Sequence, residues 1–447
     1  VIVGKPTLLI YETLNIYQQI NYLLRLMKKR FFIIISILLI FISSIFFINK
    51  IDKGENLPKY YQSFSSNSYK IFMELPEIIK STIMIFSGKK EFSNLVNDYN
   101  VKFLPETQYL NLSFSKKKID FDNSKRHTFY IETFRENLIF VTKKGDFLKA
   151  DLEELTNDKK EIKTTRLLKN DLILPNEDRL QILDTLIIDD KIYLTKVVKK
   201  NNCEILSIVF SDINDILNFK VLKEFEECGK VGIGSGRIQE YNFNSIKGIL
   251  LTTSDANKDT PDQNAQDENS IFGKILFIDL DKKSYVVFSK GHRNPQGLAV
   301  KDDIIISTEH GPRGGDEINK ILYGKNYGWP IASYGYSYYN EKLLYKKSHE
   351  EHSFEEPLFA FLPSIGISEL IILSNDFDPL WKNDALVTSL NGRSIYRVKF
   401  QNNIFDKVLY TEKIFIGERI RDIKYIESNK FIVLALERTG SIGILAK

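Results

Sequence analysis

The pattern of hydrophobic and polar positions changes near residue 125. From there to the C-terminus, short runs rich in β-branched and aromatic residues alternate with Gly, Asn, Asp and Lys. Short strands at regular spacing, separated by turn residues, are typical of β-sandwiches, barrels and propellers. Examples are Leu138–Thr142, Lys191–Val198, Gly248–Thr253, Lys274–Asp279, Asp303–Thr308, Ala385–Leu390, Ser394–Phe400 and Phe431–Leu436.

The length of this region favours a propeller over the other two folds. Residues 125–447 are too many for one sandwich. Four-stranded blades repeated around an axis accommodate such a length without long exposed edges, and six blades of about 50–55 residues each fit it. The sequence therefore predicts an all-β fold, a six-bladed β-propeller over residues 125–447.

An apolar segment near the N-terminus predicts a membrane anchor. Phe31–Ile48 is 18 residues without a charge, which is long enough to cross a hydrocarbon core as one helix. The basic cluster Lys28–Arg30 predicts that residues 1–30 are cytoplasmic and that the rest of the chain lies outside. No small-residue cleavage site follows, so we expect an uncleaved signal anchor over residues 31–48 rather than a cleaved signal peptide. Met27, directly before the basic cluster, is a candidate true start.

The segment between the anchor and the propeller is predicted to be a spacer. Residues 49–124 are polar with scattered aromatics, and only Ile71–Phe86 carries helical apolar spacing. We expect one or two short helices there.

Composition narrows the class of partner. The chain is 43% hydrophobic and 27% charged, as in globular proteins, and its net charge is +4 with basic and acidic residues interleaved. No basic block with interleaved aromatics is present, so no nucleic-acid partner is predicted. The two cysteines, Cys203 and Cys228, lack metal-site spacing, and either a disulfide or two unpaired thiols fits the sequence. An oxidising compartment favours the disulfide.

Three segments carry the candidate chemistry, namely Gly291–Leu298, Glu309–Asn319 and Gly324–Pro330. Gly and Pro beside Arg, Asn, Asp and Glu suit loops whose backbone approaches a ligand while a few side chains orient it. Three such segments within about forty residues are poorly explained as ordinary tight turns. The apolar strand Ile304–Ser307 separates the first two. They lie at opposite ends of that strand, or at one rim if the chain turns back.

In this order and spacing, the three segments resemble the glucose/sorbosone dehydrogenase family of PQQ-dependent sugar dehydrogenases. The resemblance covers residues 125–447 and continues more weakly through Gln266-Asp267, Gly273–Leu276, Ser389-Leu390 and Arg419–Asp422. The family fold is a six-bladed propeller. The resemblance implies oxidation of an aldose-type sugar by hydride transfer to the quinone, with a respiratory electron acceptor. With the predicted anchor, it implies a bacterial inner-membrane protein whose propeller faces the periplasm.

The resemblance also implies a set of cofactor contacts. PQQ is a planar ortho-quinone with three carboxylates, and the forked guanidinium of Arg binds a carboxylate in two places. The matching positions are Arg293, Asn294, Tyr338, Arg419 and Arg421. If the last two lie on a strand, their spacing places both guanidinium groups on one face.

Calcium is the second cofactor that the resemblance implies. Ca²⁺ is a hard cation that takes backbone carbonyls and carboxylates. By motif position, the carbonyls of Gly311 and Pro312 hold the ion that polarises the quinone. Glu317 and the carbonyl of Tyr327 match a second calcium site in the family.

The catalytic base is where the sequence departs from the family. Working members have a His before a small-Gly-Arg turn, which here is Gly234–Ile238, and the His position falls on Ile233. Isoleucine cannot accept a proton, so no catalytic residue is predicted. No His lies between residues 128 and 291, and a shifted alignment therefore recovers none.

Other family positions also differ, and they keep a second function open. A Gly-Leu-Leu-Gly turn reads Gln181–Asp184 here, and a frequent Lys is replaced by Asn391. His292 and His310 occur in the matched loops of ordinary members, so we interpret them as loop-packing residues. The alternative function is a non-catalytic propeller that binds a carbohydrate or protein and keeps the cofactor loops. A propeller hydrolase such as a lactonase has no specific support.

Overall fold

The computed structural model describes residues 110–121, 127–173, 177–214, 216–229, 232–255, 263–338 and 344–447, with the backbone of residues 102–103. They belong to one compact unit, Asp98–Lys447. The predicted anchor at 31–48 and the candidate start Met27 lie outside the described residues. Within the described ranges, no helix is long and apolar enough to cross a membrane.

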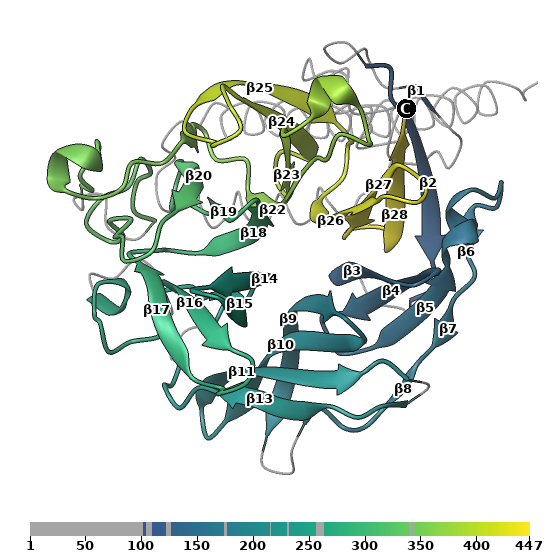
Figure 1. The fold of residues 1–447 in the computed structure, drawn as a ribbon, viewed down its shortest axis with the longest axis horizontal. Coiled ribbons are helices and arrows are strands. Elements are labelled where there is room, and N and C mark those ends of the chain that lie inside the picture. Colours follow the sequence, from purple (N-terminus) through teal and green to yellow (C-terminus); the bar gives the residue numbers. More distant parts are fainter. Residues whose placement is uncertain are drawn as a thin grey trace, which may run out of the picture. The chain divides into compact units, whose positions relative to one another are not determined.

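Five four-stranded antiparallel sheets and one six-stranded sheet, in which β1 and β6 extend a four-stranded blade, surround a central axis (Figure 1). Blade 1 is formed by β3 (Phe129–Phe134), β4 (Asn137–Thr142), β5 (Phe147–Asp151) and β7 (Thr165–Arg166). Blade 2 is formed by β9 (Asp178–Ile188), β10 (Lys191–Lys200), β11 (Cys203–Asp212) and β13 (Lys220–Glu224). Blade 3 is formed by β14 (Ile238–Phe243), β15 (Ile246–Thr252), β16 (Lys274–Asp279) and β17 (Tyr285–Lys290).

The second half of the ring repeats this plan. Blade 4 is formed by β18 (Pro295–Lys301), β19 (Ile304–Glu309), β20 (Asp316–Ile321) and β21 (Phe359–Phe361). Blade 5 is formed by β22 (Ile367–Ile372), β23 (Ala385–Ser389), β24 (Ser394–Phe400) and β25 (Val408–Phe415). Blade 6 is formed by β26 (Ile420–Ile426), β27 (Phe431–Leu436), β28 (Ser441–Ala446) and β2 (Ser113–Ile119).

Short elements complete the described part of the unit. They are the strands β1 (Lys102–Phe103), β6 (Glu161–Ile162), β8 (Leu168–Lys169) and β12 (Ile216–Leu217), and the 3-10 turns Leu152–Leu155, Gln263–Ala265, Glu350–His352 and Pro379–Trp381. The inner strands β3, β9, β14, β18, β22 and β26 contact one another in a closed ring. The predicted six-bladed β-propeller is confirmed.

The ring closes by pairing two distant parts of the chain. β2 pairs antiparallel with β28 and supplies the outer strand of blade 6. The propeller therefore includes residues that the sequence analysis placed in the spacer, before residue 125. Three consecutive lysines hide the apolar alternation of β2, yet Lys116 is buried with its Nζ 2.8 Å from Glu418 Oε2. Lys117 Nζ donates to the carbonyl of Glu154 at 2.6 Å.

The hydrophobic core lies between neighbouring blades. Both faces of a middle strand are covered, so such strands are buried along their whole length, as in β16. One cluster joins blades 2 and 3 through Leu206, Ile208, Ile249 and Leu276. This packing explains why the strands are continuous apolar runs rather than alternating ones.

Cys203 and Cys228 form a disulfide, with an S–S distance of 2.22 Å. This pairing decides between the two alternatives that the sequence left open. Glu204 and Gly229, the residues that follow, exchange two backbone hydrogen bonds of 3.1 and 2.9 Å. Together these links hold the segment that leads to Ile233 against β11.

Candidate functional site

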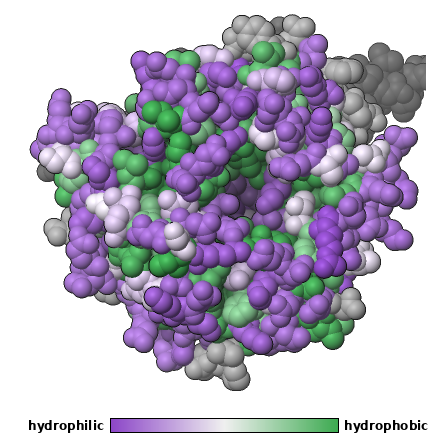
Figure 2. Space-filling model, in the orientation of Figure 1, coloured by the Kyte–Doolittle hydropathy of each residue, from purple (hydrophilic) through white to green (hydrophobic). Residues whose placement is uncertain are grey.

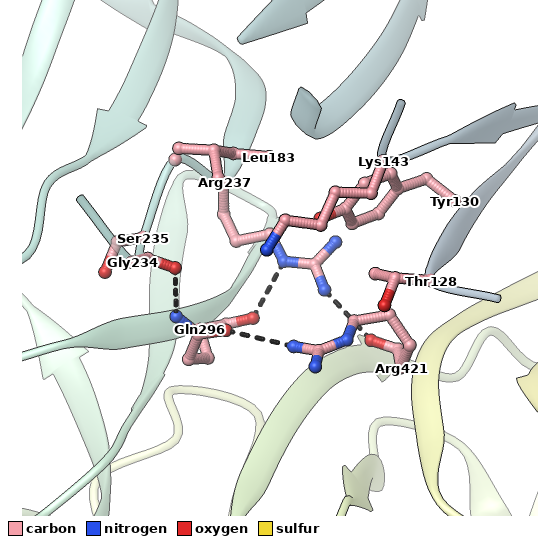
Figure 3. A pocket seen from close by; sticks show the side chains of 10 residues that line it. Thr128, Tyr130, Lys143, Leu183, Gly234, Ser235, Arg237, Gln296 and Arg421 are labelled. Atoms are coloured by element: carbon pink, nitrogen blue, oxygen red, sulfur yellow. Dashed lines mark hydrogen bonds between the residues drawn. The ribbon is translucent and has the colours of Figure 1, made fainter. Parts of the chain in front are cut away.

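Three inner strands bulge by one residue at the same level of the ring. The register skips Leu183 in β9, Gln296 in β18 and Arg421 in β26. A bulge re-aims the side chain of the extra residue. All three bulged residues line one pocket (Figure 3), whose full lining is Thr128, Tyr130, Lys143, Leu183, Gly234, Ser235, Gly236, Arg237, Gln296 and Arg421.

Arg237 lies at the base of this pocket and is 3% exposed. Its Nη1 is 2.9 Å from both Asp184 Oδ1 and Glu369 Oε2, and 3.4 Å from Asp422 Oδ1. Its Nε donates to the carbonyl of Gln296 at 2.8 Å. A buried guanidinium needs its donors and its charge satisfied: three carboxylates from blades 2, 5 and 6 surround Nη1, and Nη2 donates to the carbonyl of Arg421 at 3.0 Å.

The same carboxylates join adjacent blades. Each accepts a backbone N–H from a neighbouring inner strand, at 2.8 Å (Ile238 to Asp184), 3.0 Å (Leu298 to Glu369) and 2.7 Å (Ile131 to Asp422). Burial raises the pKa of Asp184 to about 6 and that of Glu369 to about 8, although Arg237 acts in the opposite direction. Asp184 is one of the departures from the family turn, and the structure gives it a role as a partner of Arg237.

Arg419 and Arg421 meet at one carboxylate, that of Glu437. Arg419 Nε lies 3.0 Å from Oε2, and Arg421 Nη2 lies 3.2 Å from Oε1. Burial by itself would raise the pKa of Glu437, but the two guanidinium groups override it and lower this pKa to about 2. Arg421 Nε is buried without a hydrogen-bond partner. The two arginines thus converge as predicted, although Arg421 does so from a bulge rather than through regular strand alternation.

The first two motif segments lie at one rim of blade 4. Pro295 pairs with Glu309, which places the start of β18 beside the end of β19. Arg293 Nη1 donates to the carbonyls of His310 and Gly311 at 3.2 and 3.1 Å. The structure therefore selects the single-rim arrangement over the opposite-ends one.

Asn294 supports the wall of the pocket. Its Oδ1 accepts hydrogen bonds of 2.9 Å from Ser235 Oγ and from Gln296 Nε2. Gln296 Nε2 also donates to the carbonyl of Gly234 at 2.7 Å. The first motif segment is thereby linked to the turn that follows Ile233.

The third motif segment runs beside the first. Trp329 N–H donates to the carbonyl of Gly291 at 3.0 Å, and the Arg293 guanidinium lies 5.3 Å from the centre of the Trp329 ring. Gly291 has φ of 78°, and a Cβ there would clash with Asn326. The close approach of the two segments therefore requires glycine at this position.

Comparison with known proteins agrees with this geometry. Residues 233–444 match the family model described as Glucose / Sorbosone dehydrogenase. The matched residues include all three motif segments, so the resemblance to this family that those segments carry is confirmed over this part of the chain.

Two curated relatives and one solved structure illustrate the likeness. The aldose sugar dehydrogenase YliI of Escherichia coli is 29% identical over 248 residues, which is 52% of this chain and 65% of the relative. The quinoprotein glucose dehydrogenase B of Acinetobacter calcoaceticus is 38% identical over 145 residues, 27% of this chain and 30% of the relative. The chain thus spans less than two thirds of either relative.

The solved structure is the PQQ-bound aldose sugar dehydrogenase of Streptomyces coelicolor. It superposes with a TM-score of 0.54 at 17% identity, covering 75% of this chain and 98% of that one. At this identity the likeness shows a common fold.

Of the five predicted cofactor contacts, Arg421 lines this pocket, whereas Arg293, Asn294, Arg419 and Tyr338 are not among its lining residues. Tyr338 is 48% exposed, and its ring centre lies 5.7 Å from the Arg313 guanidinium. Its contact with PQQ stays a prediction, as do those of the four other family positions.

The first predicted calcium position uses the carbonyls of Gly311 and Pro312. Because the Gly311 carbonyl accepts a hydrogen bond from Arg293, a cation there would lie beside a guanidinium of like charge. This carbonyl pair fits Ca²⁺ only after Arg293 turns toward another acceptor.

The second predicted calcium position offers a more suitable donor set. Glu317 faces Glu309 across β20 and β19, and both carboxylates are buried. Burial, followed by the charge of Glu309, raises the pKa of Glu317 well above its usual range. Asn319 Oδ1 and His349 Nδ1 are buried nearby without hydrogen-bond partners. A hard cation would neutralise the negative charge of these two carboxylates.

Tyr327 borders the same cluster. Its ring stacks on His292 at 4.6 Å, and His292 Nδ1 lies 3.0 Å from Glu309 Oε2. In the part of the chain that the structure describes, no group of three or more His, Cys, Asp or Glu side chains is arranged to hold a metal ion. A cation at Glu317 would thus depend on carbonyl oxygens such as that of Tyr327.

The Ile233 side chain faces the core rather than the pocket. It is 4% exposed and packs in the cluster between blades 2 and 3, while its N–H donates to Glu204 Oε2 at 2.7 Å. His292 is fully buried, with Nε2 2.8 Å from Ser289 Oγ. No histidine is found among the described residues that line the pocket.

Lys143, Thr128, Tyr130 and Leu183 line the pocket but were not predicted from sequence. They belong to blades 1 and 2 or to the segment before β3, far along the chain from the motif segments. Lysine is abundant here, so no local signal distinguished Lys143. Only the closed ring brings these residues to the start of β18.

Proposed function

We propose that this chain binds PQQ at the pocket between β9, β18 and β26 and oxidises an aldose-type sugar. The observation that carries the proposal is Arg421, a partly buried cation whose Nε is buried without a partner and whose side chain lines the pocket. Such a donor suits a carboxylate, of which PQQ has three. Figure 2 shows one face of the propeller, hollowed near the centre of the ring, with hydrophilic and hydrophobic residues around the hollow. The bound quinone would supply the hydride acceptor.

The residues of the chain have distinct roles in this proposal. Arg421 and Arg293 bind carboxylates, and Arg419 holds Glu437 so that Arg421 keeps its position. Asn294 and Gln296 fix the pocket wall through their hydrogen bonds to the Gly234-Ser235 turn. Turning of Arg293 toward a carboxylate would release the Gly311 carbonyl for Ca²⁺.

Glu317 is the proposed ligand of a second Ca²⁺. The raised pKa of Glu317 and the facing carboxylate of Glu309 support a cation there, because two buried like charges are otherwise unfavourable. The Tyr327 carbonyl is the proposed neutral ligand.

Turnover is expected to be slow. Among the described pocket residues none is a His or a carboxylate that could take the proton of a sugar hydroxyl. Loss of a general base typically costs about 10²–10⁴ in rate. Because the family's base position is occupied by the buried Ile233, a second function is also favoured, namely binding of a carbohydrate or protein without oxidation.

The proposed location is the periplasmic side of a bacterial inner membrane, with the predicted helix at 31–48 as anchor and a respiratory electron acceptor. The disulfide between Cys203 and Cys228 supports an oxidising compartment.

The test uses the full chain incubated with PQQ and Ca²⁺, then desalted. Retained quinone absorbance together with dye reduction in the presence of a panel of aldoses would support the proposed sugar oxidation. Retained quinone without dye reduction would favour the second function. No retained quinone would refute PQQ binding.

A further inference from the structure

Lys143 projects into the pocket from the turn between β4 and β5 (Figure 3). Its N–H donates to the carbonyl of Thr128 at 2.8 Å, and its own carbonyl accepts from Ile182 N–H at 2.8 Å. These two bonds tie the turn to the start of blade 1 and to β9 of blade 2. The backbone therefore fixes the point from which the side chain enters the pocket.

The ammonium group of Lys143 makes no hydrogen bond or ion pair with any other residue that the structure describes. Other lysines buried in this propeller are paired. Lys116 binds Glu418, Lys274 donates to two carbonyls, and Lys196 donates to the carbonyl of Leu172. A partly buried lysine without a partner is unfavourable by itself, because its charge is desolvated without compensation.

The charges around Lys143 add to this imbalance. Burial lowers the pKa of Lys143, and the guanidinium of Arg421 lowers it further. Glu437 acts in the opposite direction but is already shared by Arg419 and Arg421. The more distant Arg179 and Glu204 oppose each other.

Arg421 is the second cation in the pocket that has a hydrogen-bond donor without an acceptor. Its Nε is buried without a partner, and its Nη1 contacts Gln296 Oε1 at the long distance of 3.4 Å. Arg237, by contrast, is engaged with three carboxylates and two carbonyls. The pocket thus presents unused donors from two cations and no carboxylate among its described lining residues.

We propose that Lys143 and Arg421 together bind one carboxylate group of the molecule that occupies this pocket. Charge-assisted hydrogen bonds from an ammonium and a guanidinium are the strong kind, and the carboxylate would supply the missing counter-charge. The inference deepens the proposed function, since PQQ carries such a group. A free sugar acid offers the same chemistry from another source.

The experiment compares three variants of the full chain. Lys143→Met keeps an unbranched apolar stem and removes the charge, whereas Lys143→Arg keeps the charge. Lys144→Met is the matched control, because Lys144 is the exposed neighbour in the same turn. Affinity for PQQ is measured by equilibrium titration without turnover, and affinity for glucuronate, with glucose as the neutral control, by the shift of the thermal midpoint.

We expect Lys143→Met to weaken binding of PQQ, glucuronate or both by about tenfold or more, which corresponds to the loss of one charge-assisted hydrogen bond. Lys144→Met should leave both affinities unchanged, and Lys143→Arg should retain most of them. Without ligand, Lys143→Met should melt at the wild-type temperature or above it, because it removes an uncompensated charge beside Arg421. If Lys143 had a purely structural role, Lys143→Met would melt at a lower temperature than the wild type.

The two ligand arms separate the sources. Weakened PQQ binding assigns the carboxylate to the cofactor, and weakened glucuronate binding alone assigns it to a free acid. If the wild-type chain binds glucuronate but not PQQ, the proposed function fails while the role of Lys143 is still tested. Unchanged affinities in Lys143→Met, a lowered melting temperature without ligand, or a wild-type chain that binds neither probe would overturn the inference.

Discussion

Arg237 and Asp184 form a buried ion pair at the centre of the propeller, with Nη1 2.9 Å from Oδ1. Asp184 belongs to β9 in blade 2, and Arg237 directly precedes β14 in blade 3. Glu369 and Asp422 complete the cluster from blades 5 and 6. With the Gln296 carbonyl of blade 4, five of the six blades are thus connected through a single guanidinium, and the pocket lies directly against it.

Replacement of Arg237 should strongly destabilise the fold. Arg237→Met leaves three buried carboxylates without their shared counter-charge, and removal of one partner of a buried pair typically costs about 3–5 kcal/mol in the free energy of unfolding. Urea unfolding followed by circular dichroism measures this. The control is Arg135→Met, whose exposed pair with Asp190 should contribute about 0–1 kcal/mol. Equal effects of the two substitutions would contradict the central role of Arg237.

The cluster also predicts how stability depends on pH. Burial raises the pKa of Glu369 from 4.5 to about 8, so the folded state holds this proton more tightly than the unfolded state. The contribution is fully present below pH 4.5 and is lost as the pH rises through about 8. The free energy of unfolding should therefore fall over this window in the wild type and fall less in Glu369→Gln. Urea titrations at several pH values test this, and identical slopes in the two proteins would count against it.

Installing the missing histidine should not restore catalysis. The Ile233 side chain packs in the core between blades 2 and 3, so Ile233→His buries an imidazole among apolar groups. The expected cost is about 1–3 kcal/mol in the free energy of unfolding. Dye reduction by aldoses should not increase. Ile233→Val, at about 0.5–1.5 kcal/mol, is the packing control. A gain in dye reduction would show that residue 233 reaches the pocket.

Stabilisation of the protein by Ca²⁺ should depend on Glu317. In the absence of Ca²⁺, Glu317→Gln removes one of two facing buried carboxylates and should raise the thermal midpoint. With Ca²⁺ added, the wild type should gain stability and Glu317→Gln should not. Thermal unfolding with Ca²⁺ and with a chelator compares the two. A calcium-induced gain of equal size in both proteins would exclude Glu317 as a ligand.

The sequence was sufficient to predict the fold class because the strands and turns of each blade are encoded by short apolar runs and turn residues that are close together in the chain. It placed the start of the propeller too late, since the lysines of β2 are charged yet buried, and their partners Glu418 and Glu154 lie elsewhere in the chain. It also identified Ile233 as a departure from the family. It did not show that this side chain faces the core, because that depends on how blades 2 and 3 pack.

By itself, then, the sequence determined the family resemblance, the six blades and the three glycine-rich segments around Gly291, all of which are encoded over short stretches. Only the tertiary structure decided which side chains share the pocket. Strand alternation assigns faces within a regular strand but not at bulges, and Leu183, Gln296 and Arg421 all lie at bulges. Ring closure then brings Lys143 from blade 1 beside Arg421 from blade 6, a proximity that no local pattern of residues contains.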